Sequence, residues 1–383
     1  MTFDEADVVI VGAGFFGATI AERCARMLGK RVAVIDRRGH IGGNSYSEIH
    51  VDTGIEIHKY GTHVFHTPNK TVWDYLGSFT AFTSYQHKVF TSSNGKVFPL
   101  PINLATICQF FGRRMSPDEA RALVQEEAAE LGGKEPTNLE EKAISLMGRS
   151  LYEAFIRGYT QKQWQTSSLS LPASIIARLP VRYTLDNRYF NDPYEGLPID
   201  GYTTVFKRML AHELIDVRLG TDYFAVRDVI PANKLVIFTG PIDRFFGYRV
   251  GNLKWRTIDL EFETVSVGDF QGTAVMNYAD ASVPFTRIHE YRHLYPERTY
   301  REDCTVIARE YSRLAGSQDE PYYPVDTAQD QRMYIAYREM GKTASNVIFG
   351  GRLGTYRYLD MHQAIGAALK VFEREITPRL SGQ

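Results

Sequence analysis

Short apolar runs alternate with a helix-like segment over the first forty residues. The runs at 7–11 and 31–36 have the length and β-branched content of buried parallel strands. Residues 18–28 mix alanine, isoleucine, leucine and charged residues as helices do, and Gly29-Lys30 closes the segment. The pattern therefore predicts a β-α-β unit of about thirty residues.

Three glycines stand between the first predicted strand and the helix: Gly12, Gly14 and Gly17. The first allows a tight turn, the second lets the backbone approach a pyrophosphate, and the third lets helix and strand pack closely. Asp36 ends the second strand, where a carboxylate can accept hydrogen bonds from ribose hydroxyls. The order predicts a dinucleotide-binding domain, and a glycine-rich turn without a ligand is the alternative. A further pair, Gly42-Gly43, resembles the extended signature of FAD proteins of the glutathione-reductase-like class.

The pattern of the remaining chain predicts an α/β protein in which a helical insertion domain and an antiparallel β-sheet domain are added to a Rossmann-like domain. Helices are expected at 116–131, 139–147 and 150–160, a loop at 164–170, antiparallel strands within 254–278 and a strand at 283–288. A strand at 346–352 and a helix at 361–376 can return to the first domain. We expect a discontinuous FAD-binding domain (1–85, 201–242 and 318–383), a helical domain (101–200) with a mobile loop around 165–180, and an antiparallel β-sheet domain (86–100 and 243–317).

Composition narrows the possible partners. With 44 basic and 45 acidic residues, the chain has a net charge of −1, so nucleic acid is not an expected partner. A small anion held by a few local arginines stays open. The three cysteines are scattered, which predicts neither a disulfide scaffold nor a cysteine zinc site and suits a reducing compartment. Because there is no secretory signal and no run of about 18 apolar residues, we expect a cytoplasmic protein without membrane insertion.

Three polar patterns have competing interpretations. The segment from His289 to His293 fits H-E-x-x-H, but Pro284 and Pro296 bracket it and the stretch before it reads as a strand, so we expect no metal site. The histidine-rich segment 58–66 either runs past a flavin ring or is a structural cluster. Arg178 and Arg287 either clamp a diphosphate or are ordinary solvated arginines.

An ordered set of motifs resembles the prokaryotic UDP-galactopyranose mutase family along almost the whole chain. The matching motifs are VIVGAGFFGA at 9–18, HKYG at 58–61, HVFHT at 63–67, FPLPINL at 98–104, GYTQKQW at 158–164, LPASI at 171–175, RLPVR at 178–182, MNY at 276–278, PYYP at 321–324 and GRLGTYRYLDM at 351–361. Two positions depart from the family pattern. Thr62 stands where many bacterial members have proline, and Gln86-His87 stands where an asparagine is often found near the sugar.

The resemblance implies an FAD isomerase that interconverts UDP-galactopyranose and UDP-galactofuranose. Reduced flavin N5 would attack the anomeric carbon and displace UDP, and the ring would contract through an iminium species. It further implies an electron donor such as NAD(P)H or a reductase, and a homodimer. A flavin amine oxidase or desaturase, and a non-catalytic binder of the same fold, are the alternatives.

The resemblance also assigns roles to residues. Catalytic roles fall to Arg178, Arg287 and His63. Substrate-binding roles fall to Phe155, Tyr159, Trp164, Arg178, Tyr189, Asn277, Arg287, Tyr323 and Tyr358. Cofactor-binding roles fall to Gly12, Gly14, Phe15, Gly17, Asp36, Arg37, Gly43, Asn44, Thr62, His63, Arg352, Tyr358, Asp360 and Met361.

Overall fold

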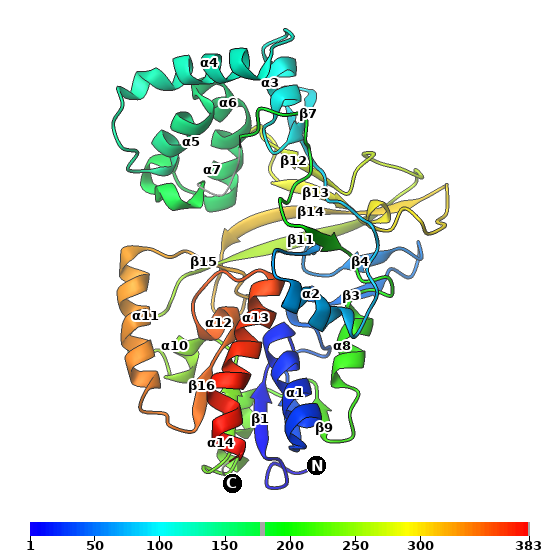
Figure 1. Cartoon of the computed structure of the whole chain (residues 1–383), viewed down its shortest axis with the longest axis vertical. Coiled ribbons are helices and arrows are strands. Elements are labelled where there is room, and N and C mark those ends of the chain that lie inside the picture. Colours follow the sequence, from blue (N-terminus) through cyan, green and yellow to red (C-terminus); the bar gives the residue numbers. More distant parts are fainter. Residues whose placement is uncertain (177–180, 382–383) are drawn as a thin grey trace.

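A five-stranded parallel sheet forms the end of the molecule that holds the N-terminus and the last helix (Figure 1). The computed structural model describes residues 1–176 and 181–381. The strand order is β16 (Val347–Phe349), β10 (Leu235–Phe238), β1 (Val8–Val11), β2 (Val32–Ile35) and β9 (Ile215–Arg218), and every neighbouring pair is parallel. This confirms the Rossmann-like α/β fold.

The predicted β-α-β unit lies at the centre of this sheet. β1 and β2 flank helix α1 (Phe15–Leu28), which begins earlier than the sequence pattern predicts because Gly14 serves as its N-cap. Gly14 has no side chain to cap the helix, and the first turn contains no acidic residue. The N–H groups of the first turn are therefore left for a ligand. Gly29 adopts a left-handed conformation and ends the helix, as expected for glycine at this position.

A seven-stranded sheet crosses the middle of the molecule (Figure 1). Its strand order is β15 (Tyr323–Pro324), β11 (Trp255–Val265), β14 (Thr305–Leu314), β13 (Arg287–Glu290), β12 (Val275–Tyr278), β6 (Val89–Ser93) and β7 (Lys96–Leu100). All neighbours are antiparallel except β12 and β6. The strands predicted within 254–278 exist as β11 and β12, but they are not paired with each other. The strand predicted at 283–288 begins only at Arg287, because bends occupy the residues around Pro284.

Helices gather at the far end of the molecule from the N-terminus (Figure 1). They are α3 (Leu104–Phe110), α4 (Pro117–Ala128), α5 (Leu139–Met147), α6 (Arg149–Leu151) and α7 (Gly158–Trp164), with a π-helical stretch (Tyr152–Arg157) between the last two. Ser116 and Glu119 form the capping box that starts α4. Lys162 of α7 fastens the helices to the sheet, since its Nζ donates to the carbonyls of Tyr278, Asp280 and Phe285 at 2.7–3.0 Å.

The remaining elements cover the two sheets. They are β3 (Ser47–Ile49), β4 (Glu56–His58), β5 (Phe65–Thr67), α2 (Lys70–Gly77), β8 (Tyr194–Gly196), α8 (Tyr202–Leu210), α9 (Tyr223–Val226), α10 (Ile242–Phe245), α11 (Ala328–Gly341), α12 (Gly351–Gly354), α13 (Met361–Val371) and α14 (Thr377–Ser381). We propose that the two sheets and the helical cluster correspond to the three predicted domains. Two short strands pair across the proposed boundaries, β15 with β11 and β8 with β5.

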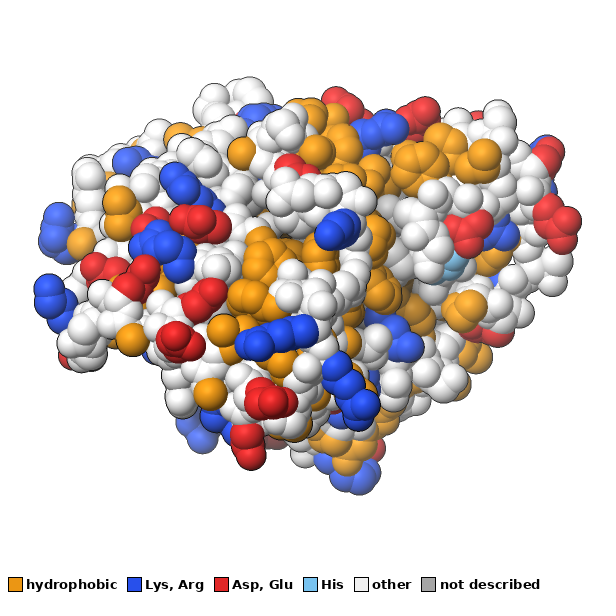
Figure 2. Space-filling model, turned by 90° about the horizontal axis from the view of Figure 1, so that it is seen from above, with side chains coloured by type: hydrophobic (Ala, Val, Ile, Leu, Met, Phe, Trp, Pro, Cys, Tyr) orange, Lys and Arg blue, Asp and Glu red, His pale blue; other side chains and the backbone are white. Residues whose placement is uncertain are grey.

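Surface charge on the face seen from above is mixed. Figure 2 shows hydrophobic side chains toward the middle of this face, with acidic and basic side chains interspersed around them. This distribution fits the balanced charge of the sequence. Among the described residues, no helix is both long enough and apolar enough to cross a membrane.

Candidate active site

A cavity of about 980 Å³ lies between the carboxyl ends of the parallel strands and one face of the seven-stranded sheet. Most residues assigned to the site from the sequence line it. They are Gly12, Gly14, Phe15, Gly17, Asp36, Arg37, Gly43, Asn44, Thr62, His63, Tyr189, Asn277, Arg287, Tyr323, Arg352, Tyr358, Asp360 and Met361. The fold thus brings together segments from both ends of the chain.

The glycine-rich end of this cavity has the shape of a dinucleotide cradle. Gly12 has a φ of +106°, and a Cβ on Gly17 would lie 2.0 Å from the Gly12 carbonyl oxygen, so helix and turn touch as the fingerprint requires. Gly14 faces Gly43, with 3.8 Å between a Cβ on Gly14 and the Gly43 Cα, and both glycines line the cavity. Bare backbone therefore lines the place where a pyrophosphate would approach α1.

An acidic and a basic side chain complete this end. The Asp36 carboxylate accepts from the backbone N–H groups of Ala13 at 2.8 Å and Arg38 at 2.9 Å, and it keeps lone pairs for further donors. Arg38 is bound to Glu320 at 2.8 Å, yet its Nη1 is buried with no hydrogen-bond partner among the described residues. Since Arg38 lines the cavity, that orphaned donor fits an anionic or hydroxyl-rich ligand. Arg38 is not among the residues to which the family resemblance assigns a role.

The histidine-rich loop contributes one cavity residue and one structural residue. His63 lines the cavity, and its Nδ1 lies 2.6 Å from the Gly61 carbonyl oxygen. A carbonyl only accepts, so Nδ1 carries the proton and Nε2 is an acceptor. Burial lowers the pKa of His63 to about 4, which keeps the ring neutral near pH 7. His58 is the structural histidine, because its Nδ1 accepts from the His63 backbone N–H at 3.0 Å.

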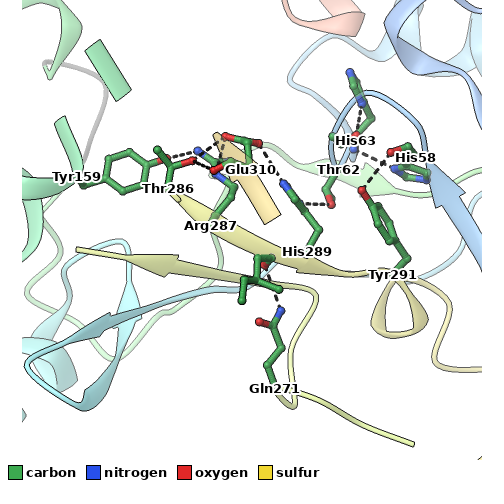
Figure 3. Close-up of polar contacts among 12 residues, drawn as sticks. His58, Thr62, His63, Tyr159, Gln271, Thr286, Arg287, His289, Tyr291 and Glu310 are labelled. Carbon is green, nitrogen blue, oxygen red and sulfur yellow. Dashed lines mark hydrogen bonds and ion pairs between the residues drawn. The ribbon is translucent and has the colours of Figure 1, made fainter. Parts of the chain in front are cut away.

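Arg287 on β13 provides the positive charge on the sheet side. Its Nε lies 3.3 Å from Glu310 Oε1, and its Nη2 donates to the Tyr159 hydroxyl (Figure 3). Burial raises the pKa of Glu310, but Arg287 and the hydrogen bond from His289 outweigh it and hold the pKa at about 2. Burial likewise opposes the charge on Arg287, and Glu310 overcomes it, so the pKa of Arg287 stays well above its usual value. The pair is ionised at any ordinary pH.

Aromatic rings and polar groups surround this arginine. The rings of Tyr323 and Tyr358 lie 5.7 Å apart, and the Arg352 guanidinium lies 4.9 Å from the Tyr358 ring. Tyr189 meets the His87 ring edge-on at 5.5 Å. Asn277 Oδ1 is buried without a hydrogen-bond partner in the part of the chain that the structure describes. Phenol hydroxyls, an amide and guanidinium groups are the donors that hold phosphate oxygens.

The residues assigned to the uridine end lie in the helical region. Phe155 is buried, with its ring packed against Phe98 at 4.9 Å and Phe110 at 5.5 Å, and Trp164 packs on the same core. Tyr159 reaches Arg287, but none of the three lines the cavity formed by the described residues. Arg178 lies outside the described residues.

The cavity is also lined by three residues to which no site role was assigned from the sequence: Glu310, His87 and His289. Glu310 sits in an ordinary alternating strand, so no local signal marks it. His289 belongs to the H-E-x-x-H segment, but it lies on β13 whereas His293 lies on the following 3-10 turn. His293 is instead 3.1 Å from Asp269 and 3.5 Å from Glu290. The expected absence of a metal stays a prediction.

Comparisons with known proteins agree on the family. A family model described as UDP-galactopyranose mutase matches residues 154–358, and one described as an NAD(P)-binding Rossmann-like domain matches residues 10–79. A probable UDP-galactopyranose mutase of Klebsiella pneumoniae is 44% identical, over 95% of this chain and 93% of that protein. A dTDP-fucopyranose mutase of Escherichia coli is 38% identical, over 95% of this chain and 96% of that protein.

Solved structures confirm the fold. The crystal structure of a reduced UDP-galactopyranose mutase superposes with a TM-score of 0.72 at 14% identity, covering 97% of this chain and 96% of that one. A putative protoporphyrinogen oxidase from Exiguobacterium gives a TM-score of 0.61, also at 14% identity, covering 98% of this chain and 99% of that one. The family, together with the Rossmann-like domain, implies a flavin cofactor. The chain therefore belongs to the UDP-galactopyranose mutase family and is an enzyme, an isomerase.

Proposed function

We propose that the enzyme interconverts UDP-galactopyranose and UDP-galactofuranose with FAD in its reduced state. The observation that carries the proposal is one cavity that joins a glycine-lined dinucleotide cradle to an ionised arginine and a group of tyrosines. One end suits a flavin dinucleotide, and the other suits a sugar diphosphate. A reduced flavin supplies an electron-rich nitrogen able to bond to an anomeric carbon.

The cofactor would be held at the carboxyl end of β1 and β2. The backbone at Gly12, Gly14 and Gly43 admits the pyrophosphate, and Asp36 accepts from the ribose. Arg38 offers its orphaned Nη1 as a further donor. Phe15, Gly17, Arg37, Asn44, Thr62, Arg352, Tyr358, Asp360 and Met361 complete the proposed cofactor site.

The diphosphate would be held on the sheet side. Arg287 presents a guanidinium whose position is set by Glu310, and Tyr189, Tyr323 and Tyr358 add hydroxyl donors. A diphosphate carries about two negative charges, and removing it from water is costly without paired cations. Glu310 already balances Arg287, so we propose that Arg178 brings the second positive charge. Asn277 would reach the nucleotide or the phosphates, and Phe155, Tyr159 and Trp164 would form the uridine end, with Phe155 acting from within the helical core.

His63 would lie beside the reacting centre and accept a hydrogen bond there. Its neutral ring presents Nε2 as an acceptor, because Nδ1 is fixed by the Gly61 carbonyl. An N–H of the cofactor or a hydroxyl of the sugar could donate to that atom. The ring then orients its partner without adding a charge.

The test is conversion of UDP-galactofuranose with and without dithionite. We expect a yellow protein that converts the substrate only after reduction. Conversion at the same rate without reductant would contradict the proposal. A flavin oxidase would instead consume an electron acceptor without isomerising the sugar, and a non-catalytic binder would hold the nucleotide without turnover.

A dTDP-fucopyranose substrate is the second candidate, because a relative with that name is 38% identical over nearly the whole chain. Parallel kcat/KM measurements with UDP-galactopyranose and dTDP-fucopyranose distinguish the two. We expect the UDP sugar to be preferred. An electron donor such as NAD(P)H or a reductase, a homodimer and a cytoplasmic location stay predictions.

A further inference from the structure

One continuous chain of polar contacts joins the loop that carries His63 to Arg287 (Figure 3). Thr62 Oγ1 lies 2.8 Å from His289 Nδ1, and His289 Nε2 lies 3.1 Å from Glu310 Oε2. Glu310 Oε1 in turn lies 3.3 Å from Arg287 Nε. We infer that His289 and Glu310 are positioning residues that hold the diphosphate-binding arginine and the Thr62-His63 loop as one unit, which deepens the proposed function and rests on it.

The strand geometry explains why one carboxylate serves two partners. Arg287 and His289 stand two positions apart on β13, so their side chains project from the same face of the sheet. Glu310 on the neighbouring strand β14 is directly opposite Arg287. Each of its two oxygens therefore meets a different side chain of β13, and Thr286 Oγ1 adds a hydrogen bond to Oε1 at 3.2 Å.

The direction of every hydrogen bond in this chain is determined. Glu310 is ionised and can only accept, so His289 Nε2 must carry a proton. Burial lowers the pKa of His289, so the ring is neutral and its Nδ1 is an acceptor. The Thr62 hydroxyl must then donate to Nδ1. A serine at position 62 keeps this donor, and valine removes it with almost no change of shape.

Thr62 thus has a task that proline, which many family members carry there, cannot perform. Glu310 fixes the tautomer of His289, and the Thr62 hydroxyl holds the orientation of the ring by donating to Nδ1. The ring engages Glu310 Oε2, which leaves Oε1 for Arg287. All four residues line the cavity, but Thr62 and Arg287 are partly exposed, whereas Glu310 and His289 are almost fully buried. The hydrogen bonds from Thr62 to His289 and from His289 to Glu310 restrain these three side chains, and the ion pair with Glu310 adds Arg287 to the network.

The test compares Thr62→Val with Thr62→Ser in the flavin-loaded enzyme. Titration with UDP, which requires no turnover, should show affinity about threefold to tenfold weaker in T62V, the loss expected for one neutral hydrogen bond. Affinity in T62S should stay near wild type. In a His289→Asn background, T62V should have no further effect, because Thr62 acts only through His289. Equal affinity in T62V and T62S, or a full additional loss in the double variant, would overturn the inference.

A spectroscopic measurement separates this inference from the proposed function. In 15N-labelled protein, the His289 signals, assigned by their loss in His289→Asn, should show a protonated Nε2 and an unprotonated Nδ1. The opposite tautomer, or an imidazolium at neutral pH, would overturn the inferred positioning roles of His289 and Glu310 even in an active mutase. If wild type bound no UDP and isomerised no sugar while the tautomer was as expected, the proposed function would fail but the inferred hydrogen-bond network would stand.

Discussion

Arg287 of the seven-stranded sheet donates a hydrogen bond to the hydroxyl of Tyr159 on α7, 128 residues earlier in the chain. The contact joins the sheet to the helical cluster at the edge of the cavity. Burial raises the pKa of Tyr159 to about 12, so the phenol stays neutral and accepts from the guanidinium. A diphosphate that approaches Arg287 would compete with this phenol for the same N–H groups.

Replacing Tyr159 by phenylalanine should therefore cost stability mainly in the free enzyme. The ring is kept and one hydrogen bond to a charged group is lost, worth about 1.5–3 kcal/mol and about 2–4 °C of melting temperature. With saturating UDP the difference from wild type should shrink, because phosphate oxygens replace the phenol. Melting curves with and without UDP check this. A loss of equal size in both conditions would show that Tyr159 and the ligand do not share Arg287.

Replacing Arg287 by alanine should lower turnover about 10²–10³-fold while FAD stays bound, because the main cation of the sheet side is lost. The variant leaves Glu310 buried without its partner, so Arg287→Lys provides a second variant that keeps the charge but not the planar fork. The measurement is the initial rate of UDP-galactofuranose conversion together with the flavin-to-protein absorbance ratio.

Arg309→Ala is the matched control. Arg309 is opposite Ile288 in the β13–β14 register, so it projects from the other face of the sheet, where it pairs with Glu263. Its removal should leave the rate within about twofold of wild type, as for a surface ion pair. Near-normal turnover in Arg287→Ala would remove the assigned role of Arg287.

Capping residues and the spacing of motifs along the sequence predicted those parts of the fold that depend on residues close to one another in the chain. Helix α5 begins and ends where the pattern places it, because Asn138 caps its first turn and Gly148 follows its last residue. The glycine turn and Asp36 gather at one cavity end because β1 and β2 are adjacent parallel strands. Both follow from spacing along the sequence.

Residues whose function depends on distant pairing could not be predicted in this way. Glu310 matters because β14 lies beside β13, and nothing within β14 marks one carboxylate as buried against an arginine. Likewise, the antiparallel strands expected within 254–278 exist as β11 and β12, but the strands that they pair with lie elsewhere in the chain. Phe155 was assigned to the uridine end, and its burial among Phe98 and Phe110 depends on how the helices pack.

Acid should destabilise the enzyme in two steps, starting with His63 and His87, two histidines that line the cavity. Burial lowers the pKa of His63 to about 4 and of His87 to about 3, from an ordinary value of 6.5. Below pH 6.5 the unfolded chain binds these protons before the folded one does, so stability falls as pH drops from 6.5 toward 4 and 3. Glu310, with a pKa near 2 instead of 4.5, adds a loss below about pH 4.5.

Melting temperature as a function of pH tests the first step. His87→Gln should lose less stability than wild type between pH 6.5 and 4, by up to about 1.4 kcal/mol per pH unit. His293→Gln is the contrasting control. Nearby carboxylates raise the pKa of His293 against the opposing effect of burial, so its contribution is present at low pH and is lost as pH rises through that raised value. Identical pH profiles for wild type and His87→Gln would contradict the assignment.

Gly14 offers a direct test of the cofactor cradle, because alanine fits the protein there but not the proposed ligand. The backbone of Gly14 has a φ of −80°, which alanine adopts freely, and the added Cβ would meet only Gly43 Cα at 3.8 Å. The fold should therefore persist, with a small loss at the N-cap. The methyl group would stand where the pyrophosphate approaches α1, and such overpacking costs about 1–3 kcal/mol, or roughly tenfold to a hundredfold in FAD affinity.

The measurement pairs flavin absorbance after gel filtration with the melting temperature of the cofactor-free protein. Gly77→Ala, at an exposed position with open space around it, should change neither. Gly17→Ala should lower the melting temperature itself, because its Cβ would collide with the Gly12 carbonyl at 2.0 Å. If Gly14→Ala kept its full flavin content, the pyrophosphate would not approach the start of α1, and the cradle would lie elsewhere in the cavity.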